Sequence, residues 1–191
     1  MLPDVITHYS RGLAFQSITA EAPERWPEIV AGMTDENVWG RNRFADPHYL
    51  IRRVAVERQL RAAFVALGGA PQVDRPFYCV VGRSSRWERQ QRPGMFAHVI
   101  SLDRISSEYV SFTFGDSLIC LDPDNRAEAL ARGRWIAGHH GRLVRREGLD
   151  ALLASVLADG LPAGDDRELH EHLEAQLWMR PSVGILQVLA V

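Results

Sequence analysis

Three strand-like runs follow one another along the middle of the chain, at residues 76–81, 95–102 and 109–114. Each is rich in aromatic and β-branched residues, and the polar residues 82–94 between the first two are typical of a loop. Regular βαβ units would place a helix-length apolar pattern between successive strands, and no such pattern occurs between these three runs. We therefore predict an α+β fold, with a mixed or largely antiparallel sheet and flanking helices.

The rest of the chain predicts further helices and strands around these three runs. Helices are expected at residues 23–32, 47–67, 124–133 and 147–158, and strands at residues 4–9, 141–146, 173–179 and 185–191. The 191 residues contain no repeat and no low-complexity linker, so we expect a single domain over residues 1–191.

The longest predicted helix, residues 47–67, has clear end signals. Asp46 is a good N-cap, Pro47 suits the first helical position, and Gly68 and Gly69 end the helix. One broad apolar stripe is expected to face the core: Leu50, Val54, Val56, Leu60, Ala63, Phe64 and Leu67. The charged residues are expected to face away from it: Arg52, Arg53, Glu57, Arg58 and Arg61.

Composition argues against some classes of partner. The formal net charge of −2 does not favour a nucleic-acid scavenger or a membrane-surface protein, although all 22 basic residues are arginine. No apolar run is long enough to span a membrane and no signal peptide is recognisable, so we expect a cytoplasmic protein without a membrane partner. Cys79 and Cys120 lie in apolar runs and are expected to be buried core thiols.

The segment Gly115-Asp116-Ser117-Leu118 carries the four letters of a family of lipolytic serine hydrolases, which it resembles in that motif. A nucleophilic serine needs a histidine base, and that family supplies it from a later D-x-x-H block. Here the nearest match runs from Asp166 to His170 and is one residue too long. The alternative is a Gly-Asp turn in which Ser117 caps the next backbone N–H.

Four short segments together resemble a second family, the ADP-ribosyltransferases, and among them the bacterial toxins that modify thymidine in DNA. The segments are residues 6–9 (ITHY), 76–78 (PFY), 112–116 (FTFGD) and 173–178 (LEAQLW). They occur in the family's order at similar spacing and span most of the chain. The family has Gln or Glu in many members two residues before its glutamate, whereas this chain has His172 there and Gln176 two residues after.

The resemblance implies an enzyme that uses NAD as co-substrate and cleaves its nicotinamide–ribose bond. Glu174 would be the catalytic carboxylate that stabilises an oxocarbenium-like ribose, and His8 would bind the adenosine ribose. The other implied contacts with NAD are aromatic rings that stack the nicotinamide and arginines that clamp the pyrophosphate: Tyr9, Tyr78, Phe114, Arg41 and Arg43. The acceptor, whether protein or nucleic acid, stays open.

Other interpretations of the same residues stay open. Glu174 could be a solvent-facing residue of an edge strand, His8 a polar strand end, and the two arginines could pair with Glu36 and Asp46. A non-catalytic interaction module would show an exposed apolar patch, with Trp87 or Trp178 in it. A zinc site would use histidines that lie close together in the sequence: His139, His140, His170 and His172.

Overall fold

A seven-stranded antiparallel sheet organises the computed structural model, which describes residues 2–11, 14–32, 46, 48–89, 94–160 and 169–190. The strand order across the sheet is β5-β4-β6-β2-β1-β3-β7. The strands are β1 (Val5–Arg11), β2 (Phe77–Val81), β3 (Met95–Ser101), β4 (Val110–Phe114), β5 (Leu143–Val144), β6 (Leu173–Leu177) and β7 (Leu186–Ala190). The α+β prediction is confirmed, and each strand end lies within two residues of its predicted place.

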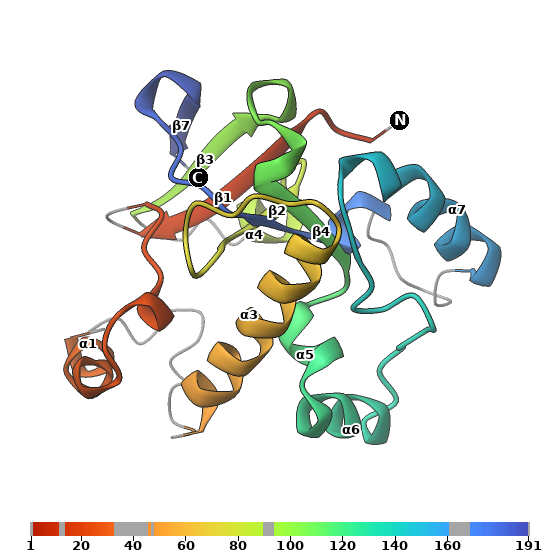
Figure 1. Cartoon of the computed structure of the whole chain (residues 1–191), viewed down its shortest axis with the longest axis horizontal. Coiled ribbons are helices and arrows are strands. Elements are labelled where there is room, and N and C mark those ends of the chain that lie inside the picture. The colour runs from red at the N-terminus through yellow and green to blue at the C-terminus, as the bar shows by residue number, and fades with distance from the viewer. Residues whose placement is uncertain are drawn as a thin grey trace.

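Helices pack around the sheet, and Figure 1 shows α3 running down from its centre with α1 and α7 on opposite sides. The helices are α1 (Trp26–Gly32), α3 (Tyr49–Ala66), α4 (Ser85–Arg89), α5 (Ser117–Leu121), α6 (Pro123–Ala131) and α7 (Leu149–Asp159). The short helices α4 and α5 were not expected from the sequence. The first lies in the segment predicted as a loop, and the second follows directly after β4.

Asp116 explains why α5 begins where it does. Gly115 turns the chain with φ of +83°, and the Asp116 carboxylate then accepts hydrogen bonds from the N–H groups of Leu118 and Ile119. These bonds satisfy helix N–H groups that have no partner within the helix. The prediction that Ser117 makes the cap is therefore wrong by one residue, because Asp116 makes it.

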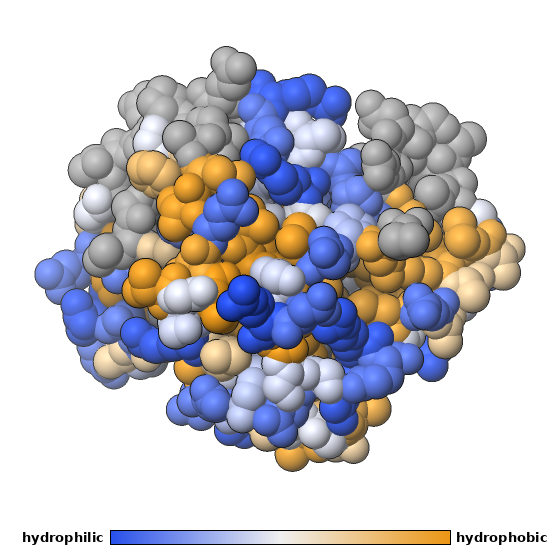
Figure 2. All heavy atoms as spheres, turned by 90° about the horizontal axis from the view of Figure 1, so that it is seen from above, coloured by the Kyte–Doolittle hydropathy of each residue, from blue (hydrophilic) through white to orange (hydrophobic). Residues whose placement is uncertain are grey.

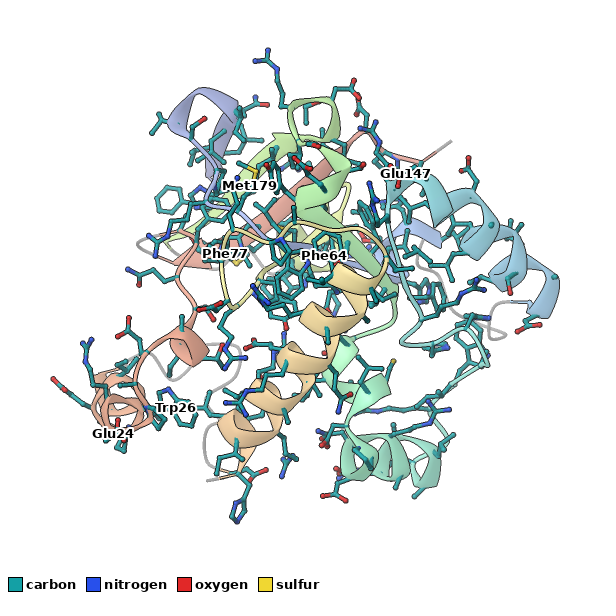
Figure 3. All side chains as sticks on the ribbon, in the orientation of Figure 1. Glu24, Trp26, Phe64, Phe77, Glu147 and Met179 are labelled. Carbon is teal, nitrogen blue, oxygen red and sulfur yellow. The ribbon has the colours of Figure 1, made fainter. Side chains whose placement is uncertain are left out.

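The two faces of the sheet bury different side chains. The larger apolar cluster lies on one face, where Leu173, Ala175 and Leu177 of β6 join residues of α7. A smaller cluster lies on the other face, where Val56, Leu60, Phe64, Leu118 and Trp178 pack together. In Figure 3, Phe64 of α3 and Phe77 of β2 both lie toward the middle of the molecule, and Glu24 and Trp26 lie out at the α1 end.

The apolar stripe of α3 is narrower than the sequence predicts. Ala63 and Leu67 are exposed, whereas Glu57, which was expected to face solvent, is 1% exposed. The buried positions of the helix are Leu50, Val56, Glu57, Leu60 and Phe64. The reason is that Tyr78 of β2 and Thr19 of the segment after β1 both donate hydrogen bonds to Glu57, and no sequence pattern displays these partners.

Both cysteines are buried free thiols, as predicted for Cys79 and Cys120. Burial raises the pKa of the Cys120 thiol to about 12 and is the main cause of the shift. A thiol of that kind stays protonated at neutral pH and behaves as an apolar core side chain.

Candidate functional site

Glu174 lies in the interior of the sheet. Its strand, β6, is flanked by β4 and β2, and Glu174 pairs with Thr113 on one side and Val80 on the other. The interpretation of Glu174 as a solvent-facing residue of an edge strand is therefore wrong. Its side chain lies on the face that α3 and α5 cover, and only part of its surface is accessible.

Two N–H donors hold the Glu174 carboxylate by the same oxygen. The side-chain amide of Gln176 donates from Nε2 to Oε1 at 2.9 Å, and the backbone N–H of Ser117 donates to Oε1 at 3.3 Å. The second donor comes from the first turn of α5. The turn after β4 and the strand β6 therefore meet at this carboxylate.

The pKa of Glu174 is raised to about 7. Burial is the largest cause, and the negative charge of Asp116 acts in the same direction. The positive charge of Arg53 and the hydrogen bonds from Ser117 and Gln176 work against the rise. Glu174 therefore changes its charge in the neutral pH range, as few carboxyl groups do.

Arg53 of α3 and Tyr78 of β2 lie beside this carboxylate. The Arg53 guanidinium carbon sits 3.7 Å from the centre of the Tyr78 ring, and Arg53 Nε lies 3.5 Å from Glu57 Oε1. The Tyr78 hydroxyl donates to the same Glu57 oxygen at 3.3 Å. A cation, an aromatic ring and two carboxylates thus share one largely buried volume between α3 and the sheet.

Glu57 connects that volume to the segment after β1. Thr19 Oγ1 donates to Glu57 Oε2 at 2.6 Å, and Arg75 Nε lies 3.7 Å from the same oxygen. Burial raises the pKa of Glu57, while the bond from Thr19 and the charges of Arg53 and Arg75 lower it. Glu57 therefore anchors four neighbours from three separate parts of the chain.

Sequence reasoning assigned Arg53 and Glu57 to the solvent face and so missed them. The signal was present in their spacing, because Leu50, Arg53, Glu57, Leu60 and Phe64 recur at intervals of three and four residues. That spacing marks one face of a helix. Two charged residues within such a stripe indicate a buried polar site rather than a solvated surface.

The structure places His8 on the opposite face of the sheet from Glu174. Thr7 pairs with Val80, and Val80 pairs with Glu174, so these three side chains share one face and the next residue, His8, points the other way. The Phe15 N–H donates to His8 Nε2 at 3.3 Å, which leaves Nδ1 to donate to the Tyr78 carbonyl at 2.8 Å. Burial lowers the pKa of His8.

Tyr9 and Phe114 have other neighbours than Glu174. The Tyr9 ring stacks on Trp87 at 5.3 Å, and its hydroxyl donates to Glu88 Oε1 at 3.0 Å. Phe114 has no accessible surface and stacks against His172 at 5.5 Å. Of the aromatic residues implied by the resemblance, only Tyr78 lies beside the Glu174 carboxylate. Arg41 and Arg43 lie outside the described residues.

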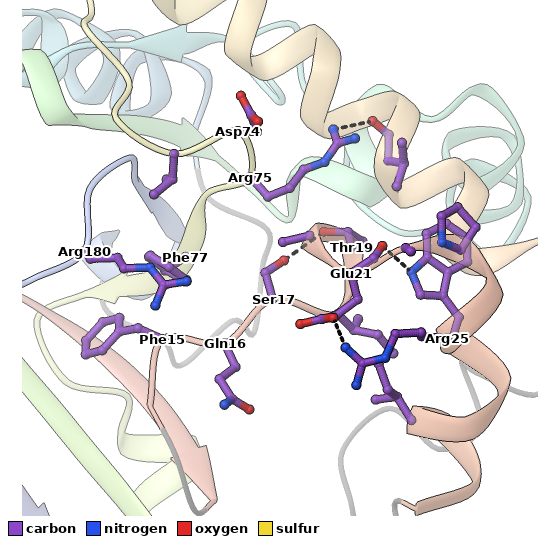
Figure 4. Close-up of a pocket in the computed structure, with 18 of the residues that line it drawn as sticks. Phe15, Gln16, Ser17, Thr19, Glu21, Arg25, Asp74, Arg75, Phe77 and Arg180 are labelled. Atoms are coloured by element: carbon purple, nitrogen blue, oxygen red, sulfur yellow. Dashed lines mark hydrogen bonds and ion pairs between the residues drawn. The ribbon is translucent and has the colours of Figure 1, made fainter.

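A cavity of about 1290 Å³ opens between the segment after β1, α1, α3 and residues 72–75. Figure 4 shows Phe15, Phe77 and Arg180 at one end of it and Thr19, Glu21 and Arg25 at the other, with Arg75 between them. Its wall adjoins His8 and Glu57, whereas Glu174 is not among the residues that line it. Phe15 stacks on His8 at 4.6 Å, and Thr19 and Arg75 contact Glu57.

The histidines of the zinc interpretation and the tryptophans of the interaction-module interpretation are the other candidate site residues. His170 and His172 lie in a 3-10 helix, Leu169–His172, and the described part of the chain contains no cluster of three or more side chains that could hold a metal ion. Trp178 is fully buried and cannot contribute to an exposed patch, and Trp87 is covered on one face by Tyr9. In Figure 2, hydrophilic residues interrupt the hydrophobic areas of the face seen from above.

Ser117 lacks the setting of a hydrolase nucleophile. Its side chain has no accessible surface, and no histidine within the described ranges forms a hydrogen bond with its hydroxyl. Its role at the site is a backbone one, because the N–H donates to Glu174. An acyl-transfer mechanism needs both an accessible oxygen and a base.

Ser117→Ala should consequently leave any enzymatic turnover within about threefold of the wild type, since alanine keeps the backbone N–H that contacts Glu174. A fluorophosphonate probe should label neither protein. Both results come from turnover assays and intact-mass measurement on the two proteins in parallel. Covalent labelling of the wild type that disappears in Ser117→Ala would instead support a serine hydrolase.

In comparisons with protein-family models, curated proteins and solved structures, nothing matches this chain. The function must therefore be argued from the site itself. Within the described ranges, no helix has both the length and the apolar character that crossing a membrane requires.

Proposed function

We propose that this protein is an ADP-ribosyltransferase-like enzyme that uses NAD as co-substrate and Glu174 as its catalytic carboxylate. The bond between ribose C1′ and the nicotinamide nitrogen breaks, and its electron pair leaves with nicotinamide. The cationic ribose then forms a bond with an acceptor nucleophile, which loses a proton. With water as acceptor, the products are ADP-ribose and nicotinamide.

The position of Glu174 carries this proposal. A carboxylate enclosed by protein stabilises a developing positive charge more strongly than one in water, because little solvent screens the interaction. Glu174 meets that requirement, since it lies within the sheet and keeps an accessible part. Two fixed N–H donors hold it in one orientation before any substrate binds.

The arrangement of the strands is a second support. The four segments that carry the resemblance fall on β1, β2, β4 and β6, and these strands lie next to one another in the order β4-β6-β2-β1. Residues separated by more than a hundred positions in the sequence thereby come to one part of the sheet. Tyr78 and Glu174, from two of those segments, lie on the same face.

The cavity supplies room for a ligand of the right size and chemistry. Its volume exceeds the several hundred Å³ typical of small-molecule sites, and Phe15, Trp26 and Phe77 offer aromatic surface for a nucleobase. Arg58 and Arg180 also line it and can meet phosphate groups. His8 would act there through Phe15, on which its ring stacks, rather than beside Glu174.

Nicotinamide release from millimolar NAD tests the proposal, with calorimetry for binding. We expect measurable heat of binding, and release that increases when the correct acceptor, protein or nucleic acid, is added. Glu171→Gln is the matched control for Glu174→Gln and should keep the wild-type rate. Glu171 lies three residues before Glu174, and its carboxylate accepts hydrogen bonds from Ser85 instead. No heat at millimolar NAD from the folded wild type would contradict the proposal.

The rate of NAD cleavage should rise with pH through a midpoint near 7. The ionised carboxylate is the active form, and the pKa of Glu174 is about 7, so activity is lost as the pH falls below that value. Burial lowers the pKa of His8 from its usual value of 6.5, so His8 titrates below this midpoint. A pH–rate profile from pH 5.5 to 8.5 checks this, and a rate independent of pH over that range would argue against Glu174 as the titrating group.

A further inference from the structure

A row of buried polar side chains crosses the sheet face under α3, and the reaction chemistry above does not account for it. Ser111, Thr113 and Gln176 have no accessible surface, and neither has Trp178 next to them. Their neighbours on this face are the apolar residues of the smaller cluster. Burying an amide and two hydroxyls is costly unless every polar atom finds a partner.

The partners form one continuous chain of hydrogen bonds. Trp178 Nε1 donates to Ser111 Oγ at 2.9 Å, and Ser111 Oγ donates to Gln176 Oε1 at 2.9 Å. Gln176 Nε2 then donates to Thr113 Oγ1 at 2.9 Å and to Glu174 Oε1 at 2.9 Å. The row thus begins at an indole and ends at the candidate catalytic carboxylate.

Trp178 at one end and Glu174 at the other set the direction of the chain of hydrogen bonds. An indole N–H can only donate, so Ser111 accepts that bond and has its own proton left to give to Gln176. The amide of Gln176 turns its oxygen toward that proton and its nitrogen toward Glu174, since an ionised carboxylate can only accept. The reverse orientation would turn the amide oxygen toward the Glu174 carboxylate, and two acceptors would then face each other.

The result is a carboxylate with two unlike oxygens. Oε1 of Glu174 accepts the N–H bonds from Gln176 and Ser117. No donor from the described residues bonds to Oε2. We propose that Gln176 is a positioning residue that holds Glu174 by Oε1, and that Oε2 is thereby left as the oxygen that meets a substrate.

One part of this inference rests on the proposed function: that Oε2 contacts a hydroxyl or a developing positive charge of the substrate ribose. The holding of Oε1 is a property of the free protein. It can be measured without substrate, so a failure of one idea is distinguishable from a failure of the other.

Gln176→Met is the decisive variant, because methionine keeps the length of the side chain and removes both of its polar atoms. The measurement is the pKa of Glu174, from carbon-13 NMR of protein with labelled glutamate carboxyls, with the Glu174 signal assigned by its absence in Glu174→Gln. Loss of a bond to the charged form should raise that pKa by about one to two units. The midpoint of the pH–rate profile should rise by the same amount.

Thr113→Val is the matched control, since it removes the other partner of the same amide nitrogen and leaves the bond to Glu174 in place. We expect the pKa of Glu174 to move by less than about half a unit in this variant. If Gln176→Met does not fold, Ser111→Ala replaces it, because the amide of Gln176 then loses the bond that fixes its orientation. That variant should give a smaller rise in the same direction.

The outcomes separate the two ideas. A raised pKa in Gln176→Met with no NAD cleavage by the wild type supports the positioning role and contradicts the proposed function. An unchanged pKa in a folded Gln176→Met protein, or an equal rise in Thr113→Val, overturns the positioning role, whatever the wild type does with NAD.

Discussion

Glu174→Gln should lower the rate of NAD cleavage by a factor on the order of a thousand or more, with little change in NAD affinity. The substitution keeps the shape of the side chain and removes the charge that would stabilise the cationic ribose. A carbonyl oxygen at this place can still accept from Gln176 and Ser117. Nicotinamide release measures the rate, and calorimetry with NAD measures the binding.

The same variant should be more stable than the wild type at alkaline pH. Burial raises the folded-state pKa of Glu174 to about 7, above the usual value of 4.5, so the folded protein binds the extra proton between these two pH values. Wild-type stability then falls as pH rises from about 4.5 to 7, by an amount on the order of 3 kcal/mol. Glutamine does not titrate and avoids this loss.

Thermal or urea unfolding of both proteins at pH 4.5 and pH 8.5 checks this. The variant should show an advantage of a few kcal/mol at pH 8.5, and that advantage should shrink at pH 4.5. Loss of activity together with gain of stability is the mark of a group kept in an unfavourable setting for function. An equal stability difference at both pH values would show that burial does not control this carboxyl group.

Glu57→Ala should destabilise the protein by about 3–5 kcal/mol, because it leaves two largely buried cations without their carboxylate. Arg53 and Arg75 have side chains only 12% and 14% exposed, and both lie within 4 Å of Glu57. The hydroxyls of Thr19 and Tyr78 also lose their acceptor. Urea unfolding measures the effect, and a shift of the melting temperature on the order of 10 °C should accompany it.

Glu128→Ala is the control for this prediction. Glu128 forms an exposed pair with Arg132 on α6, with side chains more than half accessible, and its removal should cost well under 1 kcal/mol. Glu57→Gln should fall between the two variants, because glutamine keeps one acceptor oxygen. If Glu57→Ala and Glu128→Ala cost the same, the ion cluster beneath α3 contributes little to stability.

Much of the fold could be predicted because strand signals are local. Residues 173–177 alternate between apolar and polar side chains, and that period is sufficient to assign a strand and to separate Glu174 from Leu173, Ala175 and Leu177. Helix α3 likewise begins and ends within two residues of its predicted bounds, although His48 rather than Asp46 takes the N-cap position. Short helices such as α5 were missed because five residues carry too little periodicity.

The candidate site was predictable only in part. The resemblance implied Glu174, Tyr78 and His8 as site residues, but pairing across the sheet decided that Glu174 and Tyr78 share a face while His8 does not. Arg53 and Glu57 carry ordinary helix-surface residue types. Their role depends on α3 lying over β6 and β2, which no local pattern records.

The sequence by itself determined the strands and the longer helices of this protein and the alternation of side chains along β6, because these follow from local periodicity. Only the tertiary structure decided what each face meets. It placed α3 and α5 over the polar face of β6, where Gln176 and Ser117 hold Glu174 and where Arg53 lies nearby. Burial and charge at Glu174 depend on neighbours distant in the sequence, and for that reason its pKa is a property of the fold.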